Sequence, residues 1–299
     1  MNSSKKAHIN GVLLVNKPLH SSSNYILQKV RRKFNAKKAG HTGSLDPLAT
    51  GMLPICFGDA TKFCQFMLDA DKSYTATGIL GKNTATQDAE GEIVEERSFE
   101  HVSEQSLIDA LVKFTGDIKQ VPSMYSALKK DGVPLYKLAR QGIEVERKAR
   151  AITIHELELV DFKPPFFTIN VKFSKGTYIR NLVEDIGNYL SAGAYVDKLH
   201  RNYSCPFDGQ EMFTLERLDK ADNLMGLLHP IESMVGQFPK IDINVSQKEC
   251  LYYGQEIEVD GKLELGNYYQ LFVAQQSFIG LGQYVDEHRL KSKRLIAQF

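Results

Sequence analysis

The chain has 299 residues, of which 42% are hydrophobic and 24% charged, and its formal net charge is +1. This length allows a full hydrophobic core and more than one domain, and the composition excludes a disordered or fibrous protein. No stretch approaches the roughly 18 apolar residues of a membrane span, and no signal-peptide core is present. We therefore expect a cytoplasmic protein without membrane contact.

Two elements are expected before residue 40. The apolar run Gly11–Val15 predicts a short buried strand. Ser21–Ser23 can cap a helix that continues to about Phe34, because Ile26 and Val30 share one helical face with that phenylalanine. The basic residues of this helix lie mostly off the apolar face, where they could hold a nucleic-acid backbone.

The loop that follows is the most unusual segment of the chain. It runs G-H-T-G-S-L-D-P-L-A-T-G from Gly40 to Gly51, and its Asp46 is the first acidic residue, after nine lysines and arginines. Glycines let a ligand approach the backbone closely, and Pro47 stiffens the residue beside the carboxylate. A solvated Asp in a polar turn is one interpretation. The other is a reactive carboxylate at the mouth of a polyanion-binding surface.

Residues 52–142 predict alternating strands and helices. The expected elements are a strand at Met52–Phe57, a helix at Asp59–Leu68 capped by Asp59, a strand at Lys72–Leu80, a helix near Ser103–Phe114 and a short helix opened by Pro134 and closed by Gly142. Between them, Asp88–Glu104 holds seven acidic residues against one arginine. We expect this acidic block to be solvated surface.

The next elements complete one domain. Strands are expected at Ile152–Val160, Phe167–Phe173 and Gly193–Tyr203, with a helix at Thr177–Leu190. Strands and helices without a regular βαβ repeat predict an α+β fold. Near Pro239 the pattern changes to short apolar segments broken by glycines, which predicts a small β-rich domain. We therefore expect domains at residues 1–237 and 238–299.

Candidate functional residues lie around the Asp46 loop. A catalytic carboxylate needs a cation beside it, and Arg180, at the start of a helix, could hold Asp46 through two parallel bonds. A structural ion pair is the alternative for this arginine. Tyr74 could stack on a nucleobase or be an ordinary core tyrosine, and His41 could equally be a turn histidine. The cysteines Cys56, Cys64, Cys205 and Cys250 lack zinc-site spacing and predict buried thiols in a reducing compartment.

Several segments also occur in an order that is typical of one protein family. They are G-H-T-G-S-L-D-P-L-A-T-G-M-L-P, G-D-A-T-K-F, D-K-S-Y, K-G-T-Y-I-R and G-A-Y-V-x-x-L-x-R, with N-K-P near the start. Together, over residues 10–205, they resemble the TruB family of pseudouridine synthases. The C-terminal segment resembles the small β-barrel RNA-binding domain of the PUA type. The resemblance implies a mixed, mostly antiparallel sheet flanked by helices, followed by that barrel.

The resemblance further implies a reaction. A uridine in the T-loop of tRNA, at conventional position 55, would be isomerised to pseudouridine without cofactor or metal, after the base is flipped out of its stack. Carried over by motif, Asp46 would be the nucleophile, Tyr74 would stack on the base, and Arg180 would pair with Asp46. The further residues implied in substrate binding are Lys17, His41, Tyr178 and Leu199. His200 departs from the family pattern, in which a second arginine is common, and this puts one RNA contact in doubt.

Two other functions remain open at this level. A non-catalytic protein could use the same surface to bind or fold tRNA, and a related synthase could act on another RNA. We expect tRNA, through its T-arm stem-loop, to be the partner of a monomer that has no obligate protein partner.

Overall fold

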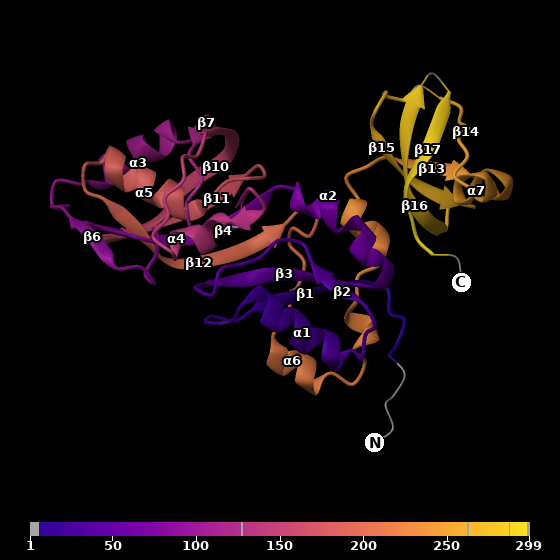
Figure 1. The fold of residues 1–299 in the computed structure, drawn as a ribbon, viewed down its shortest axis with the longest axis horizontal. Coiled ribbons are helices and arrows are strands. Elements are labelled where there is room, and N and C mark those ends of the chain that lie inside the picture. Colours follow the sequence, from indigo (N-terminus) through magenta and orange to yellow (C-terminus); the bar gives the residue numbers. More distant parts are fainter. Residues whose placement is uncertain (1–5, 127, 262, 287, 298–299) are drawn as a thin grey trace.

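The computed structural model describes residues 6–126, 128–261, 263–286 and 288–297. Lys5, which belongs to the basic N-terminal segment, lies outside them. The described residues form an eight-stranded sheet, a five-stranded sheet and two short two-stranded ladders. In Figure 1 the five-stranded sheet lies apart from the larger one, at the yellow end of the chain. Among these residues, no helix is both long enough and apolar enough to cross a bilayer.

The large sheet has the order β1-β3-β12-β4-β11-β10-β7, with β2 paired to β3. Its strands are β1 (Gly11–Lys17), β2 (Ala39–His41), β3 (Ala49–Phe57), β4 (Lys72–Leu80), β7 (Gly116–Gln120), β10 (Arg150–Lys163), β11 (Phe166–Phe173) and β12 (Ala194–Ser204). Only β12 and β3 are paired in parallel within this described sheet. The predicted mixed, mostly antiparallel α+β architecture is confirmed.

Helices cover this sheet, and short elements connect its strands. The helices are α1 (Ser23–Lys33), α2 (Cys64–Leu68), α3 (Glu104–Lys113), α4 (Leu135–Ala139), α5 (Ile179–Tyr189) and α6 (Leu215–Lys220), with 3-10 turns η1 (Gly58–Phe63), η2 (Met225–Leu227) and η3 (Ile231–Val235). The ladders pair β5 (Lys82–Thr84) with β6 (Ile93–Glu96), and β8 (Lys129–Lys130) with β9 (Val133–Pro134). Helix α5 packs on β12 and β4, and its first turn lies near the loop between β2 and β3, because Arg180 contacts Asp46 there.

The predicted N-terminal helix is confirmed. The Ser22 side chain accepts a hydrogen bond from the Tyr25 amide and so caps α1. Ile26 and Val30 are buried beneath it, and Phe34, which follows the last helical residue, stacks on Phe57 with ring centroids 4.8 Å apart. The periodicity of three apolar side chains was therefore sufficient to predict which face of this helix is buried.

The predicted helix Asp59–Leu68 is wrong in its first half. That half is the 3-10 turn η1, and Asp59 lies within its first turn instead of capping it. The Asn10 side chain accepts from the Asp59 amide at 2.8 Å, so a residue from a distant segment supplies the cap. The cysteine expectation also needs correction, because only Cys56 is buried and the other three are partly exposed.

The C-terminal sheet curls into an open half-barrel, which confirms the predicted PUA-like, β-rich segment. Its order is β13-β15-β16-β17-β14, with β13 (Lys240–Ile243), β14 (Ile257–Glu258), β15 (Tyr268–Val273), β16 (Ser277–Asp286) and β17 (Arg289–Leu295). The segment also contains a helix that we did not expect, α7 (Val245–Tyr252). Asn244 and Gln247 form a capping box at its start, a signal that the sequence does carry.

An aromatic cluster joins the two sheets. Phe63 of η1 lies 5.8 Å from Phe278 of β16, measured between ring centroids, and Phe66 of α2 lies 5.4 Å from Tyr268 of β15. Met234 of η3 is fully buried in the same cluster. The C-terminal sheet is thus packed against the elements that immediately follow β3.

Candidate active site

A cavity of about 370 Å³ lies where the β2–β3 loop meets the start of α5. Five of the predicted site residues line it: Asp46, Tyr74, Tyr178, Arg180 and Leu199. Lys17 and His41 do not belong to its lining. Residues far apart in the sequence therefore converge here, as the resemblance implied.

The loop between β2 and β3, which carries Asp46, is anchored by side chains from α1 and β1. The Ser23 hydroxyl, at the start of α1, accepts from the Leu45 amide at 2.7 Å and lies 3.0 Å from the Leu45 carbonyl oxygen. The Lys17 ammonium donates to the carbonyls of Pro18 at 2.9 Å and Ser21 at 2.7 Å, and it lies 3.5 Å from that of Pro47. Lys17 therefore supports the loop beside Asp46 from outside the cavity.

Arg180 forms an ion pair with Asp46 through a single nitrogen. Its Nε lies 3.2 Å from Asp46 Oδ2, while its Nη1 lies 3.0 Å from Asp88 Oδ2. The remaining donors reach the Thr86 carbonyl at 3.0 Å and the Tyr125 carbonyl at 3.1 Å. The expected pair of parallel bonds to Asp46 is wrong, because the rest of the guanidinium is held by these other acceptors.

Asp88 is a residue of this network that sequence reasoning missed. It belongs to the acidic block expected to be solvated, yet it is only 3% exposed. Its Oδ1 accepts from the Thr86 hydroxyl at 2.5 Å and from the Glu90 amide at 3.1 Å, which leaves Oδ2 for Arg180. A buried carboxylate with these partners fixes the guanidinium in one orientation.

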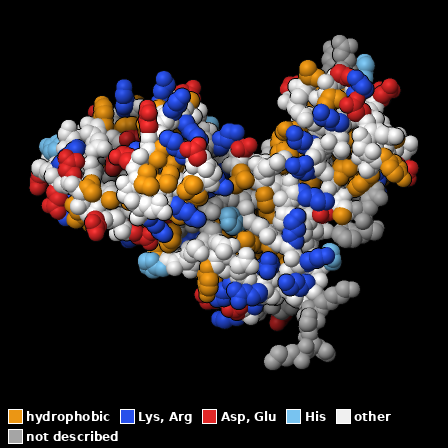
Figure 2. All heavy atoms as spheres, viewed as in Figure 1, with side chains coloured by type: hydrophobic (Ala, Val, Ile, Leu, Met, Phe, Trp, Pro, Cys, Tyr) orange, Lys and Arg blue, Asp and Glu red, His pale blue; other side chains and the backbone are white. Residues whose placement is uncertain are grey.

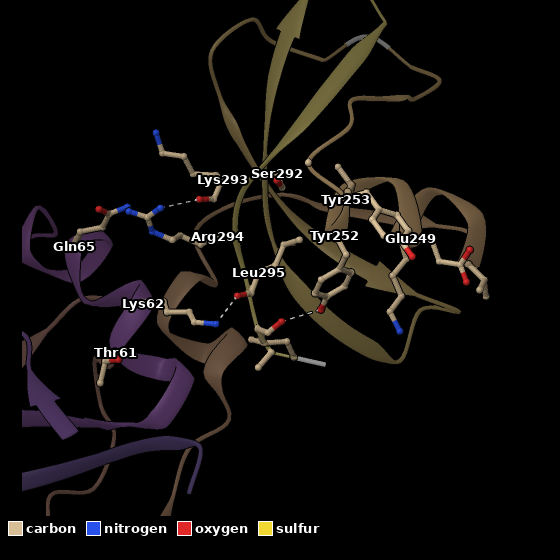
Figure 3. A pocket seen from close by; sticks show the side chains of 16 residues that line it. Thr61, Lys62, Gln65, Glu249, Tyr252, Tyr253, Ser292, Lys293, Arg294 and Leu295 are labelled. Carbon is tan, nitrogen blue, oxygen red and sulfur yellow. Dashed lines mark hydrogen bonds between the residues drawn. The ribbon is translucent and has the colours of Figure 1, made fainter. Parts of the chain in front are cut away.

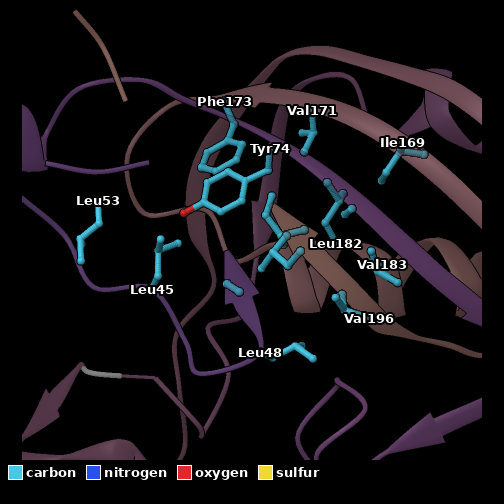
Figure 4. Packing of buried hydrophobic residues seen from close by; sticks show 14 of the residues in the cluster. Leu45, Leu48, Leu53, Tyr74, Ile169, Val171, Phe173, Leu182, Val183 and Val196 are labelled. Carbon is cyan, nitrogen blue, oxygen red and sulfur yellow. The ribbon is translucent and has the colours of Figure 1, made fainter. Parts of the chain in front are cut away.

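Tyr74 forms an aromatic wall of the cavity. It stacks on Phe173, as Figure 4 shows. The ring centroids are 5.5 Å apart and the ring planes meet at 21°. Its hydroxyl accepts from Nη1 of Arg201 at 3.3 Å. Arg201 is 1% exposed and also donates to the carbonyls of Met52 and Gly43, at 2.6 and 3.2 Å. This second buried arginine was not among our predicted site residues.

Tyr178 and Leu199 complete the described wall. The Gln120 side chain holds Tyr178, because its Oε1 accepts from the Tyr178 amide at 2.8 Å and its Nε2 donates to the Tyr178 carbonyl at 3.1 Å. Leu199 lies on β12 opposite Ala49 of β3, and its side chain is mostly buried. Backbone pairing between strands therefore sets the position of Leu199, and two hydrogen bonds from the Gln120 side chain set that of Tyr178.

Two histidines lie outside the cavity. His41 is on β2, where burial lowers its pKa and its Nδ1 has no hydrogen-bond partner among the described residues. His200, the departure from the family pattern, lies with its Nδ1 2.8 Å from the Thr50 hydroxyl, and burial lowers its pKa as well. His200 is thus engaged with β3.

This arrangement is suited to reactions on a flat, polar ring. The half-exposed Asp46 carboxylate lines the cavity, and the ring of Tyr74 forms one wall. The Arg180 guanidinium pairs with this carboxylate and is itself held by three other acceptors. A carboxylate placed in this way can act as a nucleophile or stabilise charge in a transition state. Among the described residues, no group of three or more His, Cys, Asp or Glu side chains is arranged to hold a metal ion.

Comparison with known proteins shows the class of enzyme to which the chain belongs. It is an RNA pseudouridine synthase, which is an isomerase. Models of three TruB regions match it, namely the TruB family pseudouridylate synthase N-terminal domain over residues 31–179, the tRNA pseudouridylate synthase B C-terminal domain over 180–236, and the pseudouridine synthase II TruB C-terminal region over 239–296. The chain belongs to the TruB family, and the predicted resemblance is confirmed.

Relatives match nearly the whole chain. A tRNA pseudouridine synthase B of Legionella pneumophila (strain Lens) is 48% identical over 294 residues, which cover 98% of this chain and 97% of the relative. One of Haemophilus influenzae (strain 86-028NP) is 47% identical over 97% of this chain and 96% of its own length. A solved Cbf5–Nop10–Gar1 complex shares the fold, with a TM-score of 0.77 and 24% identity over 97% of this chain and 86% of the other.

Proposed function

We propose that this chain converts uridine 55 in the T-loop of tRNA to pseudouridine, with Asp46 as the nucleophile. The observation that carries the proposal is the Asp46–Arg180 pair facing a cavity walled by Tyr74. The names of the relatives support tRNA as the substrate. In the reaction the bond between N1 and the sugar breaks, the base rotates, and a bond from C5 to the sugar forms while C5 loses a proton and N1 gains one.

The cavity geometry supports base flipping. A uridine inside a folded tRNA must be extruded before a side chain can reach it, at a cost of a few kcal/mol. Tyr74 would stack on the extruded base, and this contact would offset roughly 1–3 kcal/mol of that cost. Leu199 and Tyr178 would bound the uracil, and Lys17 would hold the loop behind Asp46. His41 would contact the extruded nucleotides from β2.

We further propose that residues 1–237 form the catalytic domain and residues 238–299 an RNA-binding domain. A groove of about 1300 Å³ runs between η1 and α2 on one side and α7 and β17 on the other. Lys62, Lys248, Lys293 and Arg294 line it against a single acidic residue, Glu249. Figure 3 shows the groove, and Figure 2 shows basic side chains gathered on this face. Such a surface suits an RNA backbone.

The two alternatives differ in what they require of the site. A pure RNA binder needs no carboxylate in a cavity beside an aromatic wall, so the geometry favours catalysis. A synthase for another RNA would use the same cavity and differ in the surface around it. We further propose that the chain acts as a monomer without an obligate protein partner.

The test is to incubate the protein with unmodified tRNA transcript and excess chelator, and to map any pseudouridine formed. We expect product at position 55 alone. Asp46→Asn should abolish turnover and leave tRNA affinity within a few fold, because the amide is isosteric with the carboxylate but a far weaker nucleophile. If the wild-type protein binds tRNA but forms no pseudouridine, the non-catalytic tRNA-binding function is favoured. Product at another position, or only in another RNA, would favour the second alternative.

A further inference from the structure

The lining of the active-site cavity carries an excess of positive charge. It includes four basic residues, Lys72, Lys175, Arg180 and Arg201, and a single acidic one, Asp46. The ring of uracil is neutral, so the reacting base does not balance this excess. The remaining cations are therefore balanced either by acceptors of the protein itself or by a charged part of the substrate.

Three of the four cations are held by the protein. Arg180 and Arg201 each donate to several acceptors of the chain. Burial lowers the pKa of Lys72 to about 8, so its amine is still mostly charged at pH 7. This ammonium donates to three backbone carbonyls where α2 ends, those of Met67, Leu68 and Ala70, at 3.4, 3.2 and 2.7 Å. Carbonyls at a helix end lack partners within the helix, so Lys72 satisfies the chain itself.

Lys175 differs from these three cations. Its side chain is 63% exposed, and its ammonium lies 3.3 Å from Oδ1 of Asp69, whose side chain is 68% exposed. Within the described part of the chain, this ion pair is the only polar contact of that ammonium. An exposed pair contributes little to stability, because water and salt screen both charges. A ligand can therefore take Lys175 from Asp69 at little cost.

The backbone that carries Lys175 is held in place. Ser174, the preceding residue, donates from its amide to the Thr153 carbonyl and accepts from the Thr153 amide through its hydroxyl, both at 2.9 Å. The Thr177 hydroxyl donates to the Ser174 carbonyl at 3.1 Å and closes the turn before α5. Gly176 has a φ of +85°, which other residues rarely adopt. The long side chain of Lys175 can thus exchange partners while its backbone stays where it is.

We propose that Lys175 binds a backbone phosphate of the RNA next to the extruded uridine, and that Asp69 holds the ammonium until the RNA arrives. The inference depends on the proposed function, because the phosphate belongs to the substrate. When a uracil enters the cavity, its sugar and the two flanking phosphates stay at the opening. An exposed ammonium in the lining meets one of these phosphates there. Contacts to phosphate fix the register of a protein on a nucleic acid, so Lys175 helps to place the correct nucleotide before Asp46.

The experiment uses T-arm stem-loops in which an uncharged methylphosphonate replaces the phosphate on the 5′ or on the 3′ side of the target uridine. Single-turnover reactions at low salt, where exposed charges are least screened, give the maximal rate and the enzyme concentration that produces half of it. For the wild type, we expect one replacement to raise this half-saturating concentration about fivefold, the upper end for an exposed ion pair, and to leave the maximal rate within about twofold. Lys175→Gln should cause the same rise on the unmodified RNA and no further rise on that analogue.

Asp69→Asn tests the competition for the ammonium. It should lower the half-saturating concentration about twofold when Lys175 is present, because the phosphate no longer displaces a carboxylate. It should change nothing in a protein that also carries Lys175→Gln. A gain that persists in this double variant would show that Asp69 acts by general repulsion of RNA, which contradicts its proposed role. Lys163→Gln removes the lysine of another exposed pair, with Asp161 on β10, and should behave like the wild type on every RNA.

Two outcomes would overturn the phosphate contact. One is that the wild type reacts with both methylphosphonate RNAs as it does with the unmodified RNA. The other is that the losses from Lys175→Gln and from the analogue multiply, since independent effects mean that the two groups do not touch. If the wild-type protein forms pseudouridine in none of these RNAs, the proposed function fails separately. The dissociation constants of the same RNAs then test the contact, by the same comparison of wild type and Lys175→Gln.

Discussion

Arg180 is the residue on which the active site depends most. It holds Asp46 with one nitrogen and uses the others for Asp88 and two backbone carbonyls. The family resemblance implied the pairing with Asp46, whereas the residues alone left an ordinary structural ion pair as an equal alternative. The sequence could not predict Asp88, because a count of charges over an acidic block does not show which single carboxylate turns inward.

Replacing Asp88 should therefore disturb catalysis through Arg180. Asp88→Asn breaks a buried ion pair, and we expect the free energy of unfolding to fall by about 3 kcal/mol. Pseudouridine formation should fall more than tenfold with tRNA affinity nearly unchanged. Denaturant titration and single-turnover assays measure both. Glu92→Gln, an exposed change in the same acidic segment, is the control. If the Asp88→Asn variant were fully active, the Asp88 carboxylate would not be required to position Arg180 for catalysis.

Lys17 gives the protein a pH-dependent stability. Burial lowers its pKa from 10.5 to about 8, and the nearby Asp46 partly opposes this shift. Between these two values the unfolded chain binds the proton and the folded chain does not, so stability rises with pH. From pH 8 to 10, the free energy of unfolding of the wild type should rise relative to Lys17→Met by at most about 1.4 kcal/mol per pH unit. The prediction would be contradicted if chemical denaturation gave the same dependence of unfolding free energy on pH for the wild type and for Lys17→Met.

At the scale of elements, β12 joins the two halves of the large sheet. It pairs in parallel with β3 and in antiparallel with β4, and it carries Leu199 and Arg201 into the site. The individual strands were predictable from alternating apolar residues. Their pairing was not, because residues such as Arg201 and Gly51 lie far apart in the sequence and no local pattern specifies which strands meet.

Gly51 makes that parallel pairing possible. Its φ is +98°, and a Cβ there would lie 2.3 Å from the Arg201 carbonyl oxygen and 2.7 Å from the Arg201 amide nitrogen. Gly51→Ala should therefore destabilise the fold by at least about 2 kcal/mol and reduce activity. The control is Gly40→Ala on β2, where the nearest atom to a new Cβ lies at 3.8 Å. Equal melting temperatures for the two variants would show that β3 and β12 can shift apart at no cost.

At the scale of the whole molecule, the aromatic cluster packs the C-terminal sheet against η1 and α2, and the basic groove lies along the same junction. Lys62 of η1 reinforces the junction, since its ammonium donates to the Leu295 carbonyl at the end of β17 at 3.0 Å. The composition of the last 60 or so residues predicted a β-rich unit. It could not predict where that unit packs, because the contacts are made by a few scattered rings.

Neutralising the groove should weaken tRNA binding and leave the chemistry unchanged. In a variant with Lys248→Gln, Lys293→Gln and Arg294→Gln, the plot of log affinity against log salt should lose a slope of about 2, since each phosphate contact contributes about 0.7–0.9. The rate at saturating tRNA should be that of the wild type. Lys163→Gln, an exposed lysine at the end of β10, serves as a single-site control. If the salt dependence of affinity were the same as that of the wild type, the groove would not be part of the RNA-binding surface.

The pairing of β12 with β3 also bears on how the protein is made. Asp46 leaves the ribosome before β12, the strand that carries Leu199 and Arg201 into the same cavity and ends at Ser204. Until that strand has emerged, the nascent chain exposes the edge of β3 and has no finished pocket. Synthesis itself therefore delays the first possible encounter with substrate until the chain through Ser204 is outside the tunnel.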